Sequence, residues 1–139
     1  MEETVKTPGK SMEYDYFLNE FLPKIKNTPI INFMGGEPTL HPEFNDIFRN
    51  TYKNILPYSH LSIFSNGLMP DKVLDLMLEM AGPNGTRKKN VVFAILLNWQ
   101  TPENISEKNH ERCKEVAEKM LRTNGYSVTF SLNLYSKNQ

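Results

Sequence analysis

Apolar runs and amphipathic stretches alternate along this chain at intervals of about 30 residues, the length of one βαβ unit. The four apolar runs that we interpret as strands are Ile30–Met34, Leu61–Phe64, Val91–Leu97 and Ser127–Tyr135. Parallel neighbouring strands need a crossover connection, usually a helix, so the alternation predicts an α/β fold with four parallel strands. The run Val91–Leu97 is apolar throughout, which is typical of a strand covered on both faces.

Helices are expected between these runs, because apolar residues recur there at helical spacing. Three of the helices share a start signal, a proline followed by a carboxylate in the first turn, where the helix dipole favours negative charge. The signal occurs at Pro42–Glu43, Pro70–Asp71 and Thr101–Pro102–Glu103. A further helix is expected before the first strand, with Ser11 as its N-cap and apolar positions at Met12, Tyr16, Phe17, Phe21 and Ile25.

The loops that follow the strands are expected to lie together. Right-handed crossovers place all of them at the carboxyl edge of the sheet, where α/β proteins bind ligands. This rim collects Gly35–Thr39, Ser65–Gly67, Asn98–Thr101 and the region of Asn133.

Gly35-Gly36-Glu37-Pro38 is the most informative of these loops. A pair of glycines after a strand also suits an ordinary strand-to-helix turn, and this alternative stays open. In the functional interpretation the glycines expose backbone groups to a ligand, and Pro38 holds the Glu37 carboxylate toward the rim. A carboxylate there suits a ligand ammonium group. It does not suit phosphate, which it would repel, and no lysine follows the glycines.

Composition narrows the classes of partner. The chain has 139 residues with 16 Lys and Arg against 16 Asp and Glu, so it lacks the net basic charge typical of proteins that bind nucleic acid or acidic membranes. No apolar run approaches the length of a membrane span. The single cysteine, Cys113, excludes an intramolecular disulfide and favours a reducing, cytoplasmic compartment. Cys113 with His110 has the spacing to start a metal site, but its place in an apolar stripe favours a core cysteine.

Two of the rim motifs carry a resemblance to a known family. The stretch Phe33–Pro42, which reads Phe-Met-Gly-Gly-Glu-Pro-Thr-Leu-His-Pro, resembles the second-strand signature of the radical S-adenosylmethionine superfamily. Ser65-Asn66-Gly67 resembles the end of that family's next strand, which is usually Thr-Asn-Gly. The resemblance spans roughly residues 11–135, and only its first motif is specific.

The resemblance implies a partial (β/α) barrel that binds a [4Fe–4S] cluster and S-adenosylmethionine, and generates a 5′-deoxyadenosyl radical. It implies contacts from the first loop to the methionine amino group, from the second loop to the methionine or ribose end, and from a third strand end to the ribose. The residues in these roles are Gly35, Gly36, Glu37, Pro38, Ser65, Asn66 and Asn98.

The chain differs from the family in the cysteine ligands of the iron–sulfur cluster. The family uses three thiolates in a Cys-x3-Cys-x2-Cys loop after the first strand, whereas this chain has one cysteine far downstream. We therefore expect residues 1–139 to form one partial domain that lacks the first and the later strands, with residues 1–10 as a loop. The parent protein would be the enzyme, and this chain alone would be inactive. The expected partners are the small-molecule cofactor and an unknown substrate, with no nucleic acid and no membrane.

Two alternatives remain. The chain is also consistent with a cluster-free relative that acts as a binding or scaffold module, and with an unrelated flavodoxin-like or Rossmann-type domain. The latter lacks support, because no Gly-x-Gly-x-x-Gly turn or phosphate-cradling loop follows a strand. Exposed apolar edges on an incomplete sheet further predict a homo-oligomer that forms through the first or the last strand.

Overall fold

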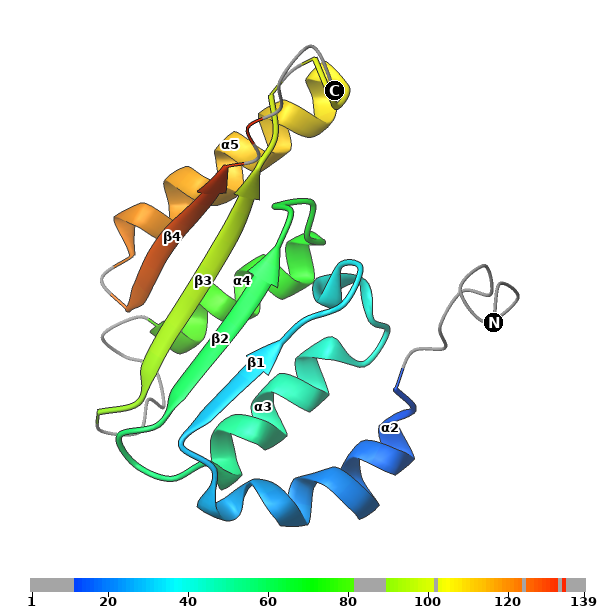
Figure 1. Ribbon diagram of the computed structural model, residues 1–139, viewed down its shortest axis with the longest axis vertical. Coiled ribbons are helices and arrows are strands. Elements are labelled where there is room, and N and C mark those ends of the chain that lie inside the picture. Colours follow the sequence, from blue (N-terminus) through cyan, green and yellow to red (C-terminus); the bar gives the residue numbers. More distant parts are fainter. Residues whose placement is uncertain (1–11, 82–89, 102, 124, 133, 135–139) are drawn as a thin grey trace.

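The structure is a computed structural model built around a four-stranded, all-parallel sheet (Figure 1). It describes residues 12–81, 90–101, 103–123, 125–132 and 134. The strands lie side by side in sequence order, and they are β1 (Ile30–Phe33), β2 (His60–Ser65), β3 (Val92–Trp99) and β4 (Tyr126–Leu132). The predicted α/β class and the parallel pairing of four strands are confirmed.

Helical segments precede β1 and connect each pair of strands. They are α2 (Tyr14–Tyr16), the π-helix η1 (Phe17–Phe21), the 3-10 helices η2 (Leu22–Asn27) and η3 (Pro38–Leu40), α3 (Phe44–Asn54), α4 (Asp71–Ala81) and α5 (Glu107–Arg122). The first three follow one another directly and form the N-terminal helical segment, residues 14–27. Among the described residues, no helix has the length and apolar character to cross a membrane.

The core lies on one face of the sheet. Each strand is followed by its immediate neighbour, so right-handed crossovers place α3, α4 and α5 on the same side. Alternate residues of the two central strands are accordingly buried, among them Leu61, Ile63, Phe93 and Ile95. The intervening Val92 is 36% exposed. The expectation that the third strand is covered on both faces is therefore wrong, because the described helices cover only one.

The other face of the sheet carries a mixture of polar and apolar side chains, and the register pair Phe64 and Leu96 is among the apolar ones. Strand register aligns Asn32, Ser62, Ala94 and Ser127 in one row across all four strands. Asn98 and Ser131 form another pair on this face near the carboxyl ends of β3 and β4. An uninterrupted apolar run in the sequence did not reveal this asymmetry, which depends on where the helices pack.

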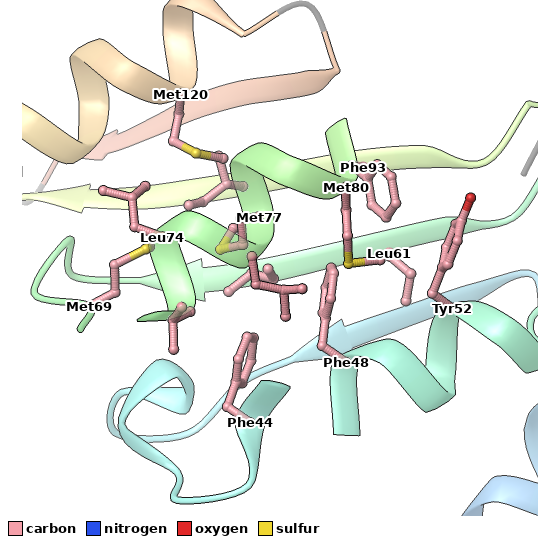
Figure 2. Close-up of a cluster of buried hydrophobic side chains, with 14 of the residues drawn as sticks. Phe44, Phe48, Tyr52, Leu61, Met69, Leu74, Met77, Met80, Phe93 and Met120 are labelled. Atoms are coloured by element: carbon pink, nitrogen blue, oxygen red, sulfur yellow. The ribbon is translucent and has the colours of Figure 1, made fainter. Parts of the chain in front are cut away.

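The packed face is filled from three helices (Figure 2). Side chains of α3, α4 and α5, with Met69 from the connection before α4, converge on β2 and β3. The labelled residues of this cluster are Phe44, Phe48, Tyr52, Leu61, Met69, Leu74, Met77, Met80, Phe93 and Met120. Four methionines are buried there, since Met69, Met77, Met80 and Met120 are at most 6% exposed. Met12 and Met34 are exposed instead.

Two predicted helices differ from the structure. The fourth helix starts at Glu107 rather than at Thr101–Pro102–Glu103, because the Ser106 side chain provides the N-cap by accepting the Asn109 N–H at 3.2 Å. The first helix is not a regular α-helix, and the predicted core position Tyr16 is exposed. Predictions on Ser11, Pro102, Asn133 and Tyr135 fall outside the described residues.

Candidate functional site

The loop after β1 begins with two glycines beside open space. Gly35 has φ +141°, a backbone conformation that side chains with a Cβ rarely adopt. A Cβ built on Gly35 or on Gly36 meets no described atom within 4 Å. The chain's own packing therefore gives no steric reason for a glycine at position 36, whereas a ligand approaching the backbone would.

Glu37 ties this loop to the loop after β2. Its Oε2 accepts hydrogen bonds from Thr39 Oγ1 at 2.5 Å and from Ser65 Oγ at 2.8 Å. Its Oε1 accepts the backbone N–H of Asn66 at 2.7 Å. Thr39 and Ser65 are 1% and 4% exposed, so both hydroxyl donors are buried. Hydrogen bonds to an ionised carboxylate are stronger than neutral ones, and these three give the two loops a common anchor.

The loop after β2 is also held by its own side chains. Ser65 Oγ accepts the N–H of Gly67 at 3.0 Å, and Asn66 Oδ1 accepts the N–H of Leu68 at 2.9 Å. Gly67 has φ +83°, and a Cβ there would stand 3.1 Å from the sulfur of Cys113. The turn therefore requires glycine for both conformation and space.

Cys113 supports the same turn from α5. Its thiol donates to the backbone carbonyl of Asn66 at 3.0 Å. Burial raises the pKa of this thiol, and the nearby negative charge of Glu37 raises the pKa further. Cys113 thus stays protonated at neutral pH and available as a donor. The interpretation of Cys113 as a core cysteine is confirmed by its 7% exposure, and His110 packs its ring against Trp99 at 5.5 Å.

A cleft of about 710 Å³ opens beside the glycines. It lies between the N-terminal helical segment, the helix-covered side of β1 and the loop that leads into α3. Apolar side chains form much of its wall, and the lining residues include Phe17, Phe21, Ile31, Phe33, Phe44 and Ile47. Gly35, Gly36, Glu37 and Pro38 also line it, so the predicted binding loop borders a cavity large enough for a small molecule.

His41 closes one wall of this cleft. Its Nδ1 accepts the backbone N–H of Glu43 at 3.0 Å, which places the ring proton on Nε2. The Nε2–H then donates to the Met12 carbonyl at 2.6 Å. His41 therefore holds Met12, which directly precedes the N-terminal helical segment, against the loop.

The structure brings most of the predicted site residues together. Glu37 is hydrogen-bonded to Ser65 and to the backbone of Asn66, although the two loops are 28 and 29 residues apart in sequence. Asn98 lies one strand further along, and strand register sets it level with position 66. The sequence predicted neither the hydrogen bond from Thr39 to Glu37 nor the one from Cys113 to the Asn66 carbonyl. Thr39 stands two residues after Glu37, a local signal that was available, whereas nothing local points to Cys113.

No family model, curated protein or solved structure matches this chain. Membership of the radical S-adenosylmethionine superfamily therefore remains a prediction from two motifs.

Proposed function

We propose that this chain is a core segment of a radical S-adenosylmethionine fold, and that the loop after β1 binds the amino end of the cofactor. Two observations support the proposal. The Gly35–Pro38 motif stands at the carboxyl end of a parallel strand, and the four described strands follow one another in sequence order with helices on one face. A segment of a (β/α) barrel has this arrangement, whereas a doubly wound sheet reverses its strand order and carries helices on both faces.

The proposal depends on the carboxylate of Glu37, which lines the cleft and can accept a further hydrogen bond. A carboxylate oxygen has two lone pairs, and Oε1 accepts a single described hydrogen bond, from Asn66. Oε1 therefore has an acceptor position left for a ligand ammonium group. The neighbouring glycines leave their backbone open, so an amine can approach the carboxylate and the main-chain carbonyls together.

The residues of this chain do not fit the iron–sulfur cluster. A cluster of this family needs three thiolates from the protein, and the sequence contains one cysteine. That cysteine is buried and donates to the Asn66 carbonyl. We therefore assign this chain a role in binding and orienting the cofactor and no step of radical formation. A cluster-free binding module would use the same site in the same way.

Calorimetric titration tests the proposed site. We expect S-adenosylmethionine to bind the wild-type chain, and methylthioadenosine, which lacks the amino acid part, to bind more weakly. Glu37→Gln removes the negative charge and should weaken S-adenosylmethionine binding by at least about tenfold, the loss of one charge-assisted hydrogen bond. Binding of methylthioadenosine should change little, which separates loss of the amine contact from collapse of the loop.

Glu43→Gln serves as the matched control. It removes the same charge close to the site but outside the residues that line the cleft, and it should leave the affinity unchanged. The proposal is wrong if the wild-type chain does not distinguish the two ligands, or if Glu37→Gln binds S-adenosylmethionine as tightly as the wild type.

A further inference from the structure

The two outer strands of the sheet lack the usual protection of sheet edges. Among the described strands, β1 and β4 each have one neighbour only. Natural edge strands commonly carry charged residues or proline, which discourage pairing with another chain. Neither Ile30–Phe33 nor Tyr126–Leu132 contains a charged residue or a proline. Both edges are therefore open to a further strand.

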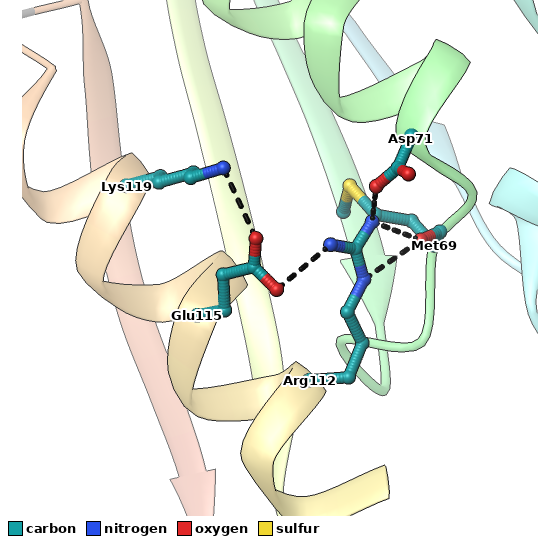
Figure 3. A network of polar contacts seen from close by, with 5 residues as sticks. All are labelled: Met69, Asp71, Arg112, Glu115 and Lys119. Atoms are coloured by element: carbon teal, nitrogen blue, oxygen red, sulfur yellow. Dashed lines mark hydrogen bonds and ion pairs between the residues drawn. The ribbon is translucent and has the colours of Figure 1, made fainter. Parts of the chain in front are cut away.

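Apolar side chains project at the β4 end of the molecule. Phe130 and Leu132 are 42% and 61% exposed, although strand register puts them level with Leu97 and Trp99 on the helix-covered face. Leu121 of α5 is also exposed. At 100° per residue it lies on the helix flank opposite Arg112, which contacts α4 (Figure 3). This end of the helix-covered side thus presents unburied apolar surface.

The β1 end presents the complementary shape. The cleft there runs along the helix-covered side of β1, where Ile31 and Phe33 line it. Phe17 and Phe21 of the N-terminal helical segment also line it. The N-terminal helical segment precedes β1 and packs beside α3, at the position of a helix that would cover a strand before β1. One end of the sheet therefore offers an apolar cleft and the other offers apolar side chains.

We propose that two copies of this chain close an eight-stranded parallel barrel, in which β4 of each copy pairs with β1 of the other. A two-fold axis along the barrel keeps all strands parallel and all helices outside. The described part of each copy contributes four strands, together with α3, α4, α5 and the N-terminal helical segment. Eight parallel strands surrounded by eight helices are the stable closed form of this architecture, and closure leaves no sheet edge exposed.

The register of the barrel can be derived from the observed strand pairs. Ile30 is level with His60 and Val92, and the pair Phe93 with Tyr126 sets Val92 level with residue 125. Barrels of this type have a shear of about eight residues, so each of two identical seams is offset by about four. The right-handed tilt of the strands sets the direction of this offset.

The offset places Thr129 of one copy beside Ile30 of the other, and Leu132 beside Phe33. All four residues of β1 then find partners within β4. Phe130 comes beside Ile31 on the helix-covered face and fills the apolar part of the cleft beneath Phe17 and Phe21. Gly35–Glu37 stays at the rim of the barrel, so the assembly is independent of whether S-adenosylmethionine binds.

The mass of the full chain in solution tests the assembly. Sedimentation equilibrium should show a dimer and no larger species, because the ring closes at two copies. Phe130→Lys places a charge in the seam and should raise the dissociation constant of the dimer by at least about tenfold, since charge is not tolerated in an apolar contact. Leu56→Lys is the matched control, because Leu56 is 41% exposed and lies in the connection between α3 and β2. It should leave the dimer intact.

A wild-type monomer at high concentration would overturn the proposal, and so would oligomers that grow without limit. Equal dissociation of the two variants, each checked for native circular dichroism, would also overturn it.

Disulfide trapping tests the register. A chain with both Ile30→Cys and Thr129→Cys should form a covalent dimer under mild oxidation. The two positions lie three strand spacings apart within one copy, about 14 Å, which exceeds the reach of a disulfide, so the bond must join two copies. Ile30→Cys with Ser127→Cys uses the same face two residues out of register and should crosslink far less. Equal crosslinking of the two pairs, or none, would contradict the seam.

Discussion

Three glycines near the candidate site differ in what they do for the chain. Gly67 has a positive φ and no room for a Cβ, because Cys113 lies 3.1 Å from the position that it would occupy. Gly35 also has a positive φ but open space around it, and Gly36 has open space alone. The fold thus requires glycine at position 67. At position 36 the described residues leave room for a side chain, so the approach of a ligand would account for the glycine there.

Substitution of these glycines by alanine should separate the two roles. We expect Gly67→Ala to lower the free energy of unfolding by about 2–3 kcal/mol through backbone strain and the contact with Cys113. Gly35→Ala should cost about 1 kcal/mol through strain alone, and Gly36→Ala should stay within about 0.5 kcal/mol. Urea denaturation of the three variants measures these values. Equal losses at positions 36 and 67 would contradict the assigned roles.

Cys113 should make the protein less stable in alkali. Burial, and then the charge of Glu37, raise the pKa of its thiol, so the folded state holds this proton more tightly than the unfolded state. The resulting stabilisation is present below the ordinary thiol pKa of about 8.5 and is lost as the pH rises through the raised value. Cys113→Ser keeps a donor for the Asn66 carbonyl but does not ionise in this range.

Urea denaturation as a function of pH tests this expectation. The wild type should lose stability more steeply than Cys113→Ser from about pH 8.5 upward, and the two should run in parallel near pH 7. Parallel curves over the whole range would show that ionisation of the thiol is not linked to folding.

Helix α5 is fixed against the start of α4 by one arginine (Figure 3). Arg112 donates to the Met69 carbonyl from Nε at 3.2 Å and from Nη2 at 2.7 Å, and it forms an ion pair with Asp71 at 2.8 Å. Glu115 orients the guanidinium from the next turn and is itself bonded to Lys119. The Lys119 hydrogen bond, followed by that of Arg112, lowers the pKa of Glu115. The side chain of Arg112 is 20% exposed, so its contacts are partly shielded from water.

Arg112→Met should therefore destabilise the protein more than loss of an ordinary surface ion pair. It leaves the Met69 carbonyl without this donor, and we expect a loss of about 1–2 kcal/mol in the free energy of unfolding. Lys114→Met is the control, because Lys114 pairs with Glu111 on the exposed face of the same helix at 3.3 Å. It should cost less than about 0.5 kcal/mol. Thermal or urea denaturation measures both, and similar losses would contradict the role of Arg112.

A series of aromatic contacts runs from β1 to β4 across the helix-covered face of the sheet. The rings of Phe33, Phe48, Phe93 and Tyr126 touch in succession, with centroids 5.2–6.0 Å apart, and so connect β1 to β4 through α3 and β3. Phe93 is 1% exposed and stands in the middle of this series. The four strands are therefore expected to unfold as one cooperative unit.

Phe93→Ala tests this cooperativity. We expect a loss of about 3–5 kcal/mol in the free energy of unfolding, because the substitution leaves a cavity between the helices and the sheet. The transition should remain single but shift to lower urea. Leu56→Ala, at a position that is 41% exposed, should cost less than about 1 kcal/mol. A separate early transition in Phe93→Ala would show that the two halves of the sheet fold independently.

Local patterns predicted the elements because the signals are local. The apolar run before Gly35 and the Pro70–Asp71 signal each concern a few consecutive residues, and the structure has β1 and α4 at these places. The same reasoning misplaced the start of α5, where a proline and a carboxylate at 102 and 103 competed with the Ser106 cap. The Ser106 side chain accepts the Asn109 N–H, and α5 begins at Glu107.

The sequence alone established the parallel α/β class and the loop Gly35–Pro38, since periodicity and backbone freedom are properties of neighbouring residues. It did not establish that Glu37 is bonded to Ser65, that Cys113 supports Asn66, or that one face of β3 is uncovered. These features arise between residues far apart in the chain, and they depend on strand register and helix packing. Only the assembled sheet brings such residues within hydrogen-bonding distance.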